Sequence, residues 1–167
     1  METPSKTSPV AEAGRFLCFS LGTGRYGIPL LCVKEVIAMP QIKSLPQTPP
    51  YFLGITNLRG KIIPIIDLHR RLNVAAAINE NSCVIICDLA SNQIGLVVSS
   101  VNQVLNLSEK QIGPRPDVAG SQKRSYITGL AKLDSGMVLL IDVAGCLDNS
   151  DRGIIEKTVV ATRTAAA

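Results

Sequence analysis

Short runs of alternating apolar and polar residues fill most of this chain, and such alternation is typical of half-buried β-strands. The first run covers residues 15–21, in which Leu17, Phe19 and Leu21 fall on one face. A Gly-Thr-Gly-Arg turn at 22–25 follows, and residue 26 begins a return strand. The pattern therefore predicts an antiparallel hairpin near the start of the chain.

A second hairpin is predicted around the Arg59-Gly60 pair, between the apolar runs 55–58 and 62–66. Pro64 lies inside the second of these runs. Because proline has no N–H to donate to a neighbouring strand, we expect that run to lie at a sheet edge or a bulge.

The second half of the chain repeats the plan of the first half in the same order. Shifted by 68 positions, four residues meet identical ones: Leu21 meets Leu89, Gly27 meets Gly95, Val33 meets Val101, and Val36 meets Val104. Shifted by 75 positions, four more coincide: Gly54 with Gly129, Leu58 with Leu133, Asp67 with Asp142, and Leu72 with Leu147. We therefore expect two similar β-lobes, each a small barrel, because closure hides strand edges. Their boundary stays open, since a strand of one half is able to complete the barrel of the other.

The composition favours a folded, β-rich protein over several other classes. The 167 residues are 46% hydrophobic and 18% charged, which excludes a disordered chain. No apolar run approaches the roughly 20 residues of a membrane helix. Residues 1–13 lack the apolar stretch of a secretory signal, so a cytoplasmic protein is expected. We expect one domain at 14–149, with a flexible N-terminal tail at 1–13 and a C-terminal tail at 150–167.

Five cysteines stand at positions 18, 32, 83, 87 and 146, several of them inside apolar runs. Neither the spacing of a zinc site nor an even set of pairing partners is present. Reduced thiols in the core are the favoured interpretation, and no metal or cofactor is expected.

The sequence offers no sustained catalytic constellation. His69 is the only histidine, and a Ser-His-Asp mechanism also needs a positioned nucleophile, so a surface histidine is the favoured interpretation. Asp67 and Asp142 each follow an apolar run and precede a short helical segment, 67–72 or 142–147. Their recurrence favours helix N-caps over phosphoacceptor aspartates. No catalytic residue is therefore assigned, and the chain is not expected to be an enzyme.

The turn at Arg59 is the most informative polar feature. Glu35 is a plausible counter-ion for the Arg59 guanidinium within the same lobe, and an exposed pair of this kind orients an interface better than it stabilises a fold. On these residues alone, an ordinary surface turn and an ordinary surface carboxylate remain an equal alternative.

Several segments together resemble the CheW family of chemotaxis coupling proteins. They are 33–37 (VKEVI), the Leu45-Pro46 loop that continues to Pro49, 54–60 (GITNLRG) and 62–68 (IIPIIDL). The likeness extends over about residues 14–149, and the Asn-Leu-Arg-Gly motif followed by Pro and Asp-Leu is its most specific part. Neither a phosphotransfer domain nor an ATP-binding kinase domain accompanies it, so a stand-alone adaptor is expected.

This resemblance implies two small five-stranded SH3-like barrels with short helices around a shared apolar core. It also implies coupling of transmembrane chemoreceptors, through their cytoplasmic tips, to the regulatory domain of a CheA-type histidine kinase. The residues that it places at these protein-binding surfaces are Val33, Glu35, Ile37, Asn57, Leu58, Arg59, Gly60 and Val104. The Ala38-Met39 pair departs from the family pattern, which leaves the receptor preference open.

Two other interpretations remain. The first is a CheW-like adaptor of a non-flagellar array, with output to type IV pili, gliding or a second messenger. The second is a small barrel that binds nucleic acid, which would need aromatic stacking platforms and a basic groove. The net charge of +4 and the presence of only three Phe and three Tyr argue against that second class.

Overall fold

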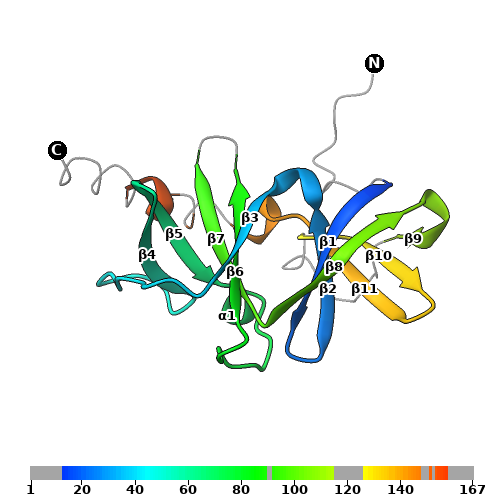
Figure 1. The fold of residues 1–167 in the computed structure, drawn as a ribbon, viewed down its shortest axis with the longest axis horizontal. Coiled ribbons are helices and arrows are strands. Elements are labelled where there is room, and N and C mark those ends of the chain that lie inside the picture. Colours follow the sequence, from blue (N-terminus) through cyan, green and yellow to red (C-terminus); the bar gives the residue numbers. More distant parts are fainter. Residues whose placement is uncertain (1–12, 90–91, 115–125, 148–150, 152, 158–167) are drawn as a thin grey trace, which may run out of the picture.

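A computed structural model describes residues 13–89, 92–114, 126–147, 151 and 153–157 of the chain. Strands dominate this part and form two sheets that lie side by side (Figure 1). The all-β class predicted from the sequence is confirmed. The predicted N-terminal tail lies outside the described residues, apart from Ala13.

The two sheets define two lobes. The six-stranded lobe contains, in spatial order, β8 (Ser100–Leu107), β1 (Gly14–Leu21), β2 (Gly24–Pro29), β11 (Gly136–Ile141), β10 (Ile127–Leu133) and β9 (Ile112–Gly113). The five-stranded lobe contains β3 (Val33–Ala38), β6 (Cys83–Asp88), β7 (Gln93–Val98), β5 (Lys61–Asp67) and β4 (Phe52–Leu58). Among the described strands, no pairing joins the two end strands of either sheet, so neither sheet closes into the predicted barrel through a continuous ladder of strand pairs.

The predicted sequence repeat corresponds to a structural repeat in which the two halves exchange hairpins. The order β8-β1-β2-β11-β10 in one lobe matches β3-β6-β7-β5-β4 in the other, strand for strand along the repeat. Even the parallel contacts correspond, because Leu140 of β11 faces Gly27 of β2 while Ile65 of β5 faces Gly95 of β7. The β1–β2 hairpin of the first half therefore lies within the sheet built mainly from the second half, and the β6–β7 hairpin of the second half lies within the sheet built mainly from the first half.

Short helices lie between and after the strands. They are η1 (Leu30–Cys32), α1 (Leu68–Arg71), η2 (Glu109–Gln111) and η4 (Ala144–Cys146). The predicted aspartate N-cap is found at Asp67 of α1, whereas η4 has Val143 as its N-cap residue and Asp142 just before it. The Asp67 carboxylate accepts a hydrogen bond from the His69 backbone N–H at 3.1 Å, and Asp142 accepts one from Gly145 at 3.2 Å. Both aspartates thus satisfy backbone donors that a helix start leaves unpaired.

Of the two alternatives predicted for the run that contains Pro64, the sheet edge is wrong, because β5 lies between β7 and β4, whereas a bulge does interrupt the β4–β5 pairing, between Phe52 and Gly54 of β4. Pro64 faces Ile55 on the β4 side. On the other side, the parallel pairing with β7 begins only at Ile65. Pro64 thus stands just before the first residue of β5 that pairs with β7, so its lack of an N–H breaks no hydrogen bond between these strands.

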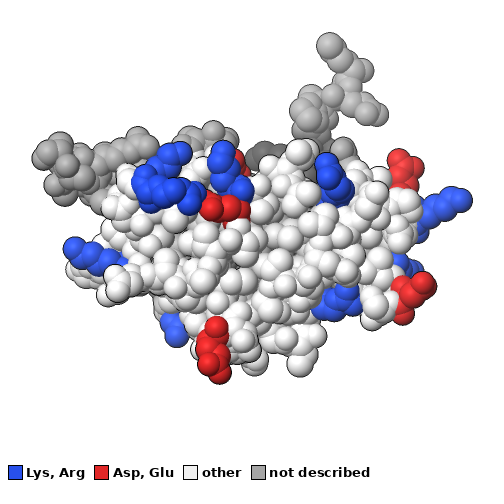
Figure 2. Space-filling model, in the orientation of Figure 1, with Lys and Arg blue, Asp and Glu red and all other residues white. Residues whose placement is uncertain are grey.

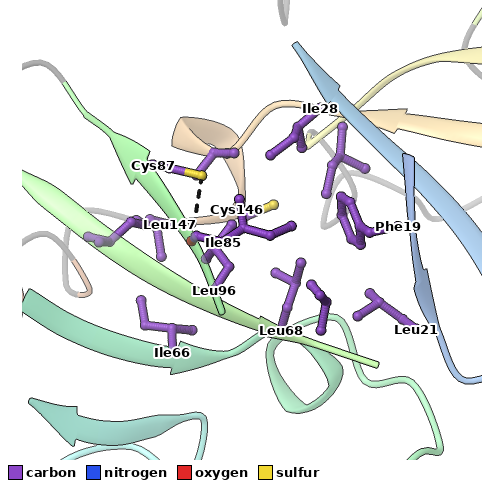
Figure 3. Packing of buried hydrophobic residues seen from close by; sticks show 14 of the residues in the cluster. Phe19, Leu21, Ile28, Ile66, Leu68, Ile85, Cys87, Leu96, Cys146 and Leu147 are labelled. Carbon is purple, nitrogen blue, oxygen red and sulfur yellow. Dashed lines mark hydrogen bonds between the residues drawn. The ribbon is translucent and has the colours of Figure 1, made fainter. Parts of the chain in front are cut away.

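One apolar cluster joins the two lobes. Its fully buried members include Phe19, Leu21 and Ile28 from the six-stranded lobe. Side chains from β5, β6 and β7 join it from the five-stranded lobe, and Figure 3 shows them pointing toward the same interior as the residues of β1. Each lobe also has a smaller cluster of its own. The shared cluster fixes the lobes together by excluding water from both at once.

The C-terminal segment differs from the predicted tail at 150–167 in its first residues. Residues 151 and 153–157 are helical, and Asp151 and Ile155 are each 2% exposed. The Tyr51 hydroxyl donates a hydrogen bond to the Asp151 carboxylate, and Arg71 Nη2 lies 3.4 Å from that carboxylate. Ile155 joins the shared cluster, so this segment belongs to the packed domain.

The cysteines are free thiols, as the sequence predicts, and burial controls their chemistry. Burial raises the pKa of Cys146 to about 12, and the nearby Asp142 carboxylate adds to the rise. Burial also raises the pKa of Cys87 well above its ordinary value. Since the thiolate is the reactive form, both side chains are poor nucleophiles while the protein is folded.

This burial predicts which thiols react with Ellman's reagent at pH 8. Cys32 and Cys83 are half-buried and should react in the folded protein, more slowly than an exposed thiol because burial raises the pKa of both, whereas Cys18, Cys87 and Cys146 are buried and should react only on unfolding. Absorbance at 412 nm counts the released thiolate, and the same titration in guanidinium chloride supplies the full count of five. Rapid labelling of Cys87 in the folded protein would contradict the described core.

Candidate docking surface

The Arg59-Gly60 turn presents a charged side chain at the end of the β4–β5 hairpin. Arg59 has a φ of 52° and Gly60 a φ of 86°, which match the two-residue type I′ turn. The Asn57 side-chain oxygen accepts a hydrogen bond from the Gly60 N–H at 2.9 Å. The turn is thus held by its own residues, and the Arg59 side chain is left 70% exposed.

Arg59 forms the predicted ion pair with Glu35, between its Nη2 and the Glu35 Oε1. Glu35 lies on β3, one end strand of the five-stranded sheet, and Arg59 follows β4, the other end strand. A β-bulge next to Glu35 interrupts the pairing of β3 with β6. The ion pair therefore connects the two ends of the curved sheet. At this exposure it adds about 0–1 kcal/mol to stability, so its value lies in fixing the direction of the two side chains.

The apolar candidates on β3 divide into packed and exposed side chains. Val33 packs against the shared cluster, and Ile37 packs against the small cluster of the five-stranded lobe. Val36, which points to the opposite side of the strand, is 41% exposed. Val36 was not among the residues predicted from the sequence, although strand alternation from half-buried Glu35 was a signal that could have found it.

Val104 lies on β8 of the six-stranded lobe, in a different sheet from the Arg59 turn. It is 50% exposed, and it is the repeat equivalent of Val36. The two lobes thus present an exposed valine at corresponding positions of corresponding strands. Leu58 is half-buried and packs against the core of the five-stranded lobe, whereas Asn57 and Gly60 are exposed with Arg59. The structure brings Glu35, Arg59 and their turn together, and it places Val104 on a different sheet.

The prediction that His69 lies on the surface is wrong, because its side chain is fully buried. Its Nδ1 lies 2.8 Å from Asp67 Oδ1, and its Nε2 lies 2.7 Å from Ser99 Oγ. A carboxylate only accepts hydrogen bonds, so Nδ1 carries a proton, and in the neutral ring Nε2 accepts from the Ser99 hydroxyl. Ser99 was not predicted from the sequence, since nothing local links it to a histidine 30 positions earlier.

Asp67, His69 and Ser99 lie within hydrogen-bond distance in the order of a hydrolytic triad, but their surroundings are those of a structural hydrogen-bond network. Ser99 Oγ already accepts a hydrogen bond from the Gly22 N–H at 3.0 Å. His69 has no exposed surface, so both of its ring nitrogens are directed to protein partners. Among the described residues, no group of three His, Cys, Asp or Glu side chains is arranged to hold a metal ion.

Comparison with known proteins assigns the chain to a family. A family model described as a CheW-like domain matches residues 15–151. The chain belongs to the CheW-like family. This is a family of scaffold and adaptor proteins without catalytic activity, so the protein is an adaptor and not an enzyme.

Similar proteins include the chemotaxis protein CheW of Klebsiella aerogenes, which is 34% identical over 93% of this chain and 95% of its own length. Protein FrzA of Myxococcus xanthus is 29% identical over 70% of this chain and 73% of its own length. The crystal structure of the scaffolding protein TtCheW from Thermoanaerobacter tengcongensis superposes with a TM-score of 0.72 at 34% identity. That match covers 78% of this chain and 90% of TtCheW. In the described part of this CheW-like chain, no helix is long and apolar enough to cross a membrane.

Proposed function

We propose that this CheW-like protein couples transmembrane chemoreceptors to a CheA-type histidine kinase in a chemotaxis array on the cytoplasmic side of the membrane. The observation that carries the proposal is the exposed Glu35–Arg59 pair, held in a fixed direction at the end of the five-stranded lobe. The role is one of binding alone, in which the adaptor holds two larger proteins at a fixed separation.

The chemistry of this surface favours a partner with acidic side chains. Arg59 is exposed enough to donate hydrogen bonds to a second carboxylate, and its planar guanidinium is suited to a bidentate contact. Lys34 and Lys61 are exposed neighbours of the pair in the sequence. Figure 2 shows Lys and Arg side chains gathered with Asp or Glu over the lobe that contains β4 and β5. Val36 is also exposed, but on the opposite side of β3 from Glu35, so it lies outside this charged surface.

A bridging protein also needs a second surface, and the repeat supplies one on the six-stranded lobe. Val104 occupies there the position that Val36 occupies on the five-stranded lobe. We assign the Glu35–Arg59 surface to the related regulatory domain of the kinase and the Val104 surface to the apolar face of a receptor helix hairpin. Contacts on different faces of one molecule are head-to-tail and are able to close into rings.

Two conservative variants test the surface on the five-stranded lobe. Arg59→Asn removes the charge but keeps a residue that tolerates positive φ, and Glu35→Gln keeps the shape of its side chain. Each should lower the amount of kinase retained on receptor-bearing membranes by about fivefold, equivalent to about 1 kcal/mol, without changing the melting temperature. Co-sedimentation with receptor membranes and kinase measures retention, and kinase activity is assayed in the same tubes.

Lys132→Asn is the matched control, because Lys132 is an exposed cation on β10 of the other lobe. It should retain kinase as the unmodified protein does. Full retention by both Arg59→Asn and Glu35→Gln would overturn the assignment of these residues. Failure of the unmodified protein to bind either partner would overturn the proposed function itself.

A further inference from the structure

Ser99 is the single residue between β7 of the five-stranded lobe and β8 of the six-stranded lobe. β7 ends at Val98 and β8 begins at Ser100. The backbone angles of Ser99 set the direction in which β8 leaves β7, and the other described connection between the two sheets runs from β2 through η1 to β3. What holds this residue therefore has a direct effect on the arrangement of the lobes.

Three hydrogen bonds hold Ser99 between the lobes. Its backbone N–H donates to the Ser20 carbonyl of β1 at 2.9 Å. Its Oγ accepts from the N–H of Gly22, in the β1–β2 turn, at 3.0 Å. The same Oγ lies 2.7 Å from Nε2 of His69. Ser20 and Gly22 belong to the hairpin of the six-stranded lobe, whereas His69 belongs to α1, which continues β5 of the five-stranded lobe.

His69 is itself fixed within the five-stranded lobe. Asp67, the last residue of β5, receives hydrogen bonds from both the ring and the backbone N–H of His69. Neighbouring Leu68 is fully buried in the shared cluster. The imidazole is therefore unable to rotate away from Ser99 without leaving a buried polar group unpaired.

The apolar cluster and this hydrogen-bonded link have different physical roles. Burial of apolar surface holds the lobes together but has little directional preference, whereas hydrogen bonds have narrow limits of distance and angle. We propose that Ser99, held by His69, is a positioning residue that sets the orientation of the two lobes and hence of their docking surfaces. The consequence for docking rests on the proposed function, whereas the orientation itself does not.

Residual dipolar couplings of the full-length protein test the orientation. In the unmodified protein, amides of both lobes should fit one common alignment tensor. In Ser99→Ala and in His69→Gln, the two lobes should require tensors of different magnitude, which reports motion between them. Ser99→Thr, which keeps the hydroxyl, should restore the common tensor. Ser20→Ala is the matched control, because the Ser20 hydroxyl bonds to Asn102 within its own lobe.

Binding experiments distinguish a changed orientation of the two lobes from damage to one of the two docking surfaces. Ser99→Ala should bind receptor membranes alone, or kinase alone, within about twofold of the unmodified protein, because each surface is intact. Kinase activation in the three-component mixture should fall by about fivefold or more, since both surfaces must be engaged at once. A loss of both single-partner interactions would instead indicate a general structural role and would overturn the proposal.

A common alignment tensor in both variants would also overturn the proposal, whatever the binding results. If a variant fails to fold, hydrogen exchange of the Gly22 amide in the unmodified protein decides the question. Protection of that amide equal to that of β1 supports the link, and exchange at the rate of an open turn contradicts it. If the unmodified protein binds neither partner, the proposed function fails while the tensor result still stands.

Discussion

Replacing Gly54 with alanine is expected to destabilise the protein more than a methyl group added at any other described glycine. A Cβ at this position would lie 2.0 Å from the Lys43 carbonyl oxygen, far inside van der Waals contact. The Gly54 φ of 144° is also one that residues with a side chain rarely adopt. The strand would have to move away from Lys43, which breaks the two backbone hydrogen bonds between Lys43 and Ile55.

We expect a loss of about 3 kcal/mol or more in the free energy of unfolding, a large fraction of the roughly 5–15 kcal/mol typical of a domain. Urea denaturation followed by circular dichroism measures it. Gly113→Ala is the matched control, because its Cβ would meet only the Leu130 carbonyl at an ordinary 3.6 Å. Gly60→Ala, with positive φ but open space around the added methyl, should give an intermediate loss. Equal stability of the three variants would show that the close approach of Lys43 to Gly54 is not required.

Phe19→Ala is expected to lower the stability of both lobes together, although Phe19 lies on β1 of the six-stranded lobe. Phe19 is fully buried in the cluster that both lobes share, and its ring stacks on Tyr26 with centroids 6.1 Å apart. Removing a buried phenyl ring typically costs about 3–5 kcal/mol through lost burial and the cavity that remains. Because the cavity would lie between the lobes, we expect a single unfolding transition shifted to lower urea concentration.

Methyl NMR signals of Val138 and Val84 measure this outcome, because each valine lies in the separate small cluster of one lobe. Both signals should lose intensity at the same urea concentration in Phe19→Ala. Met137→Ala, which shortens a 64% exposed side chain on β11, should leave the midpoint nearly unchanged. Loss of the Val138 signal at lower urea than the Val84 signal would show that the lobes unfold independently.

The local features of the fold follow from local sequence. The Arg59-Gly60 turn lies between two apolar runs, and Asp67 and Asp142 stand where a strand gives way to a helix start, so residues close in sequence determine these structures. The repeat was also visible, since the same apolar and glycine positions recur. Tyr51 and Tyr126, which are also 75 positions apart, extend this repeat, because their carbonyls accept hydrogen bonds from the N–H groups of Asp67 and Asp142 respectively.

The exchange of hairpins could not be predicted from local sequence, because an aliphatic strand is able to pair with many other strands. β1 pairs with β8, so that Leu17 faces Val104 far along the chain. The alternation of β1 only requires a neighbour of matching pattern, and strands of both halves provide one. His69 was misplaced for a related reason. Burial of a histidine needs a distant partner, and Ser99 is identified only once β7 and β8 are folded.

The exchange of hairpins between halves has a consequence for synthesis on the ribosome. β1 and β2 leave the exit tunnel first, yet their neighbours β8 and β11 are translated much later. The early hairpin must therefore wait with its apolar side chains uncovered, a stage at which nascent chains are prone to aggregate. Pauses in translation before β8 should thus prolong the interval in which a chaperone is needed.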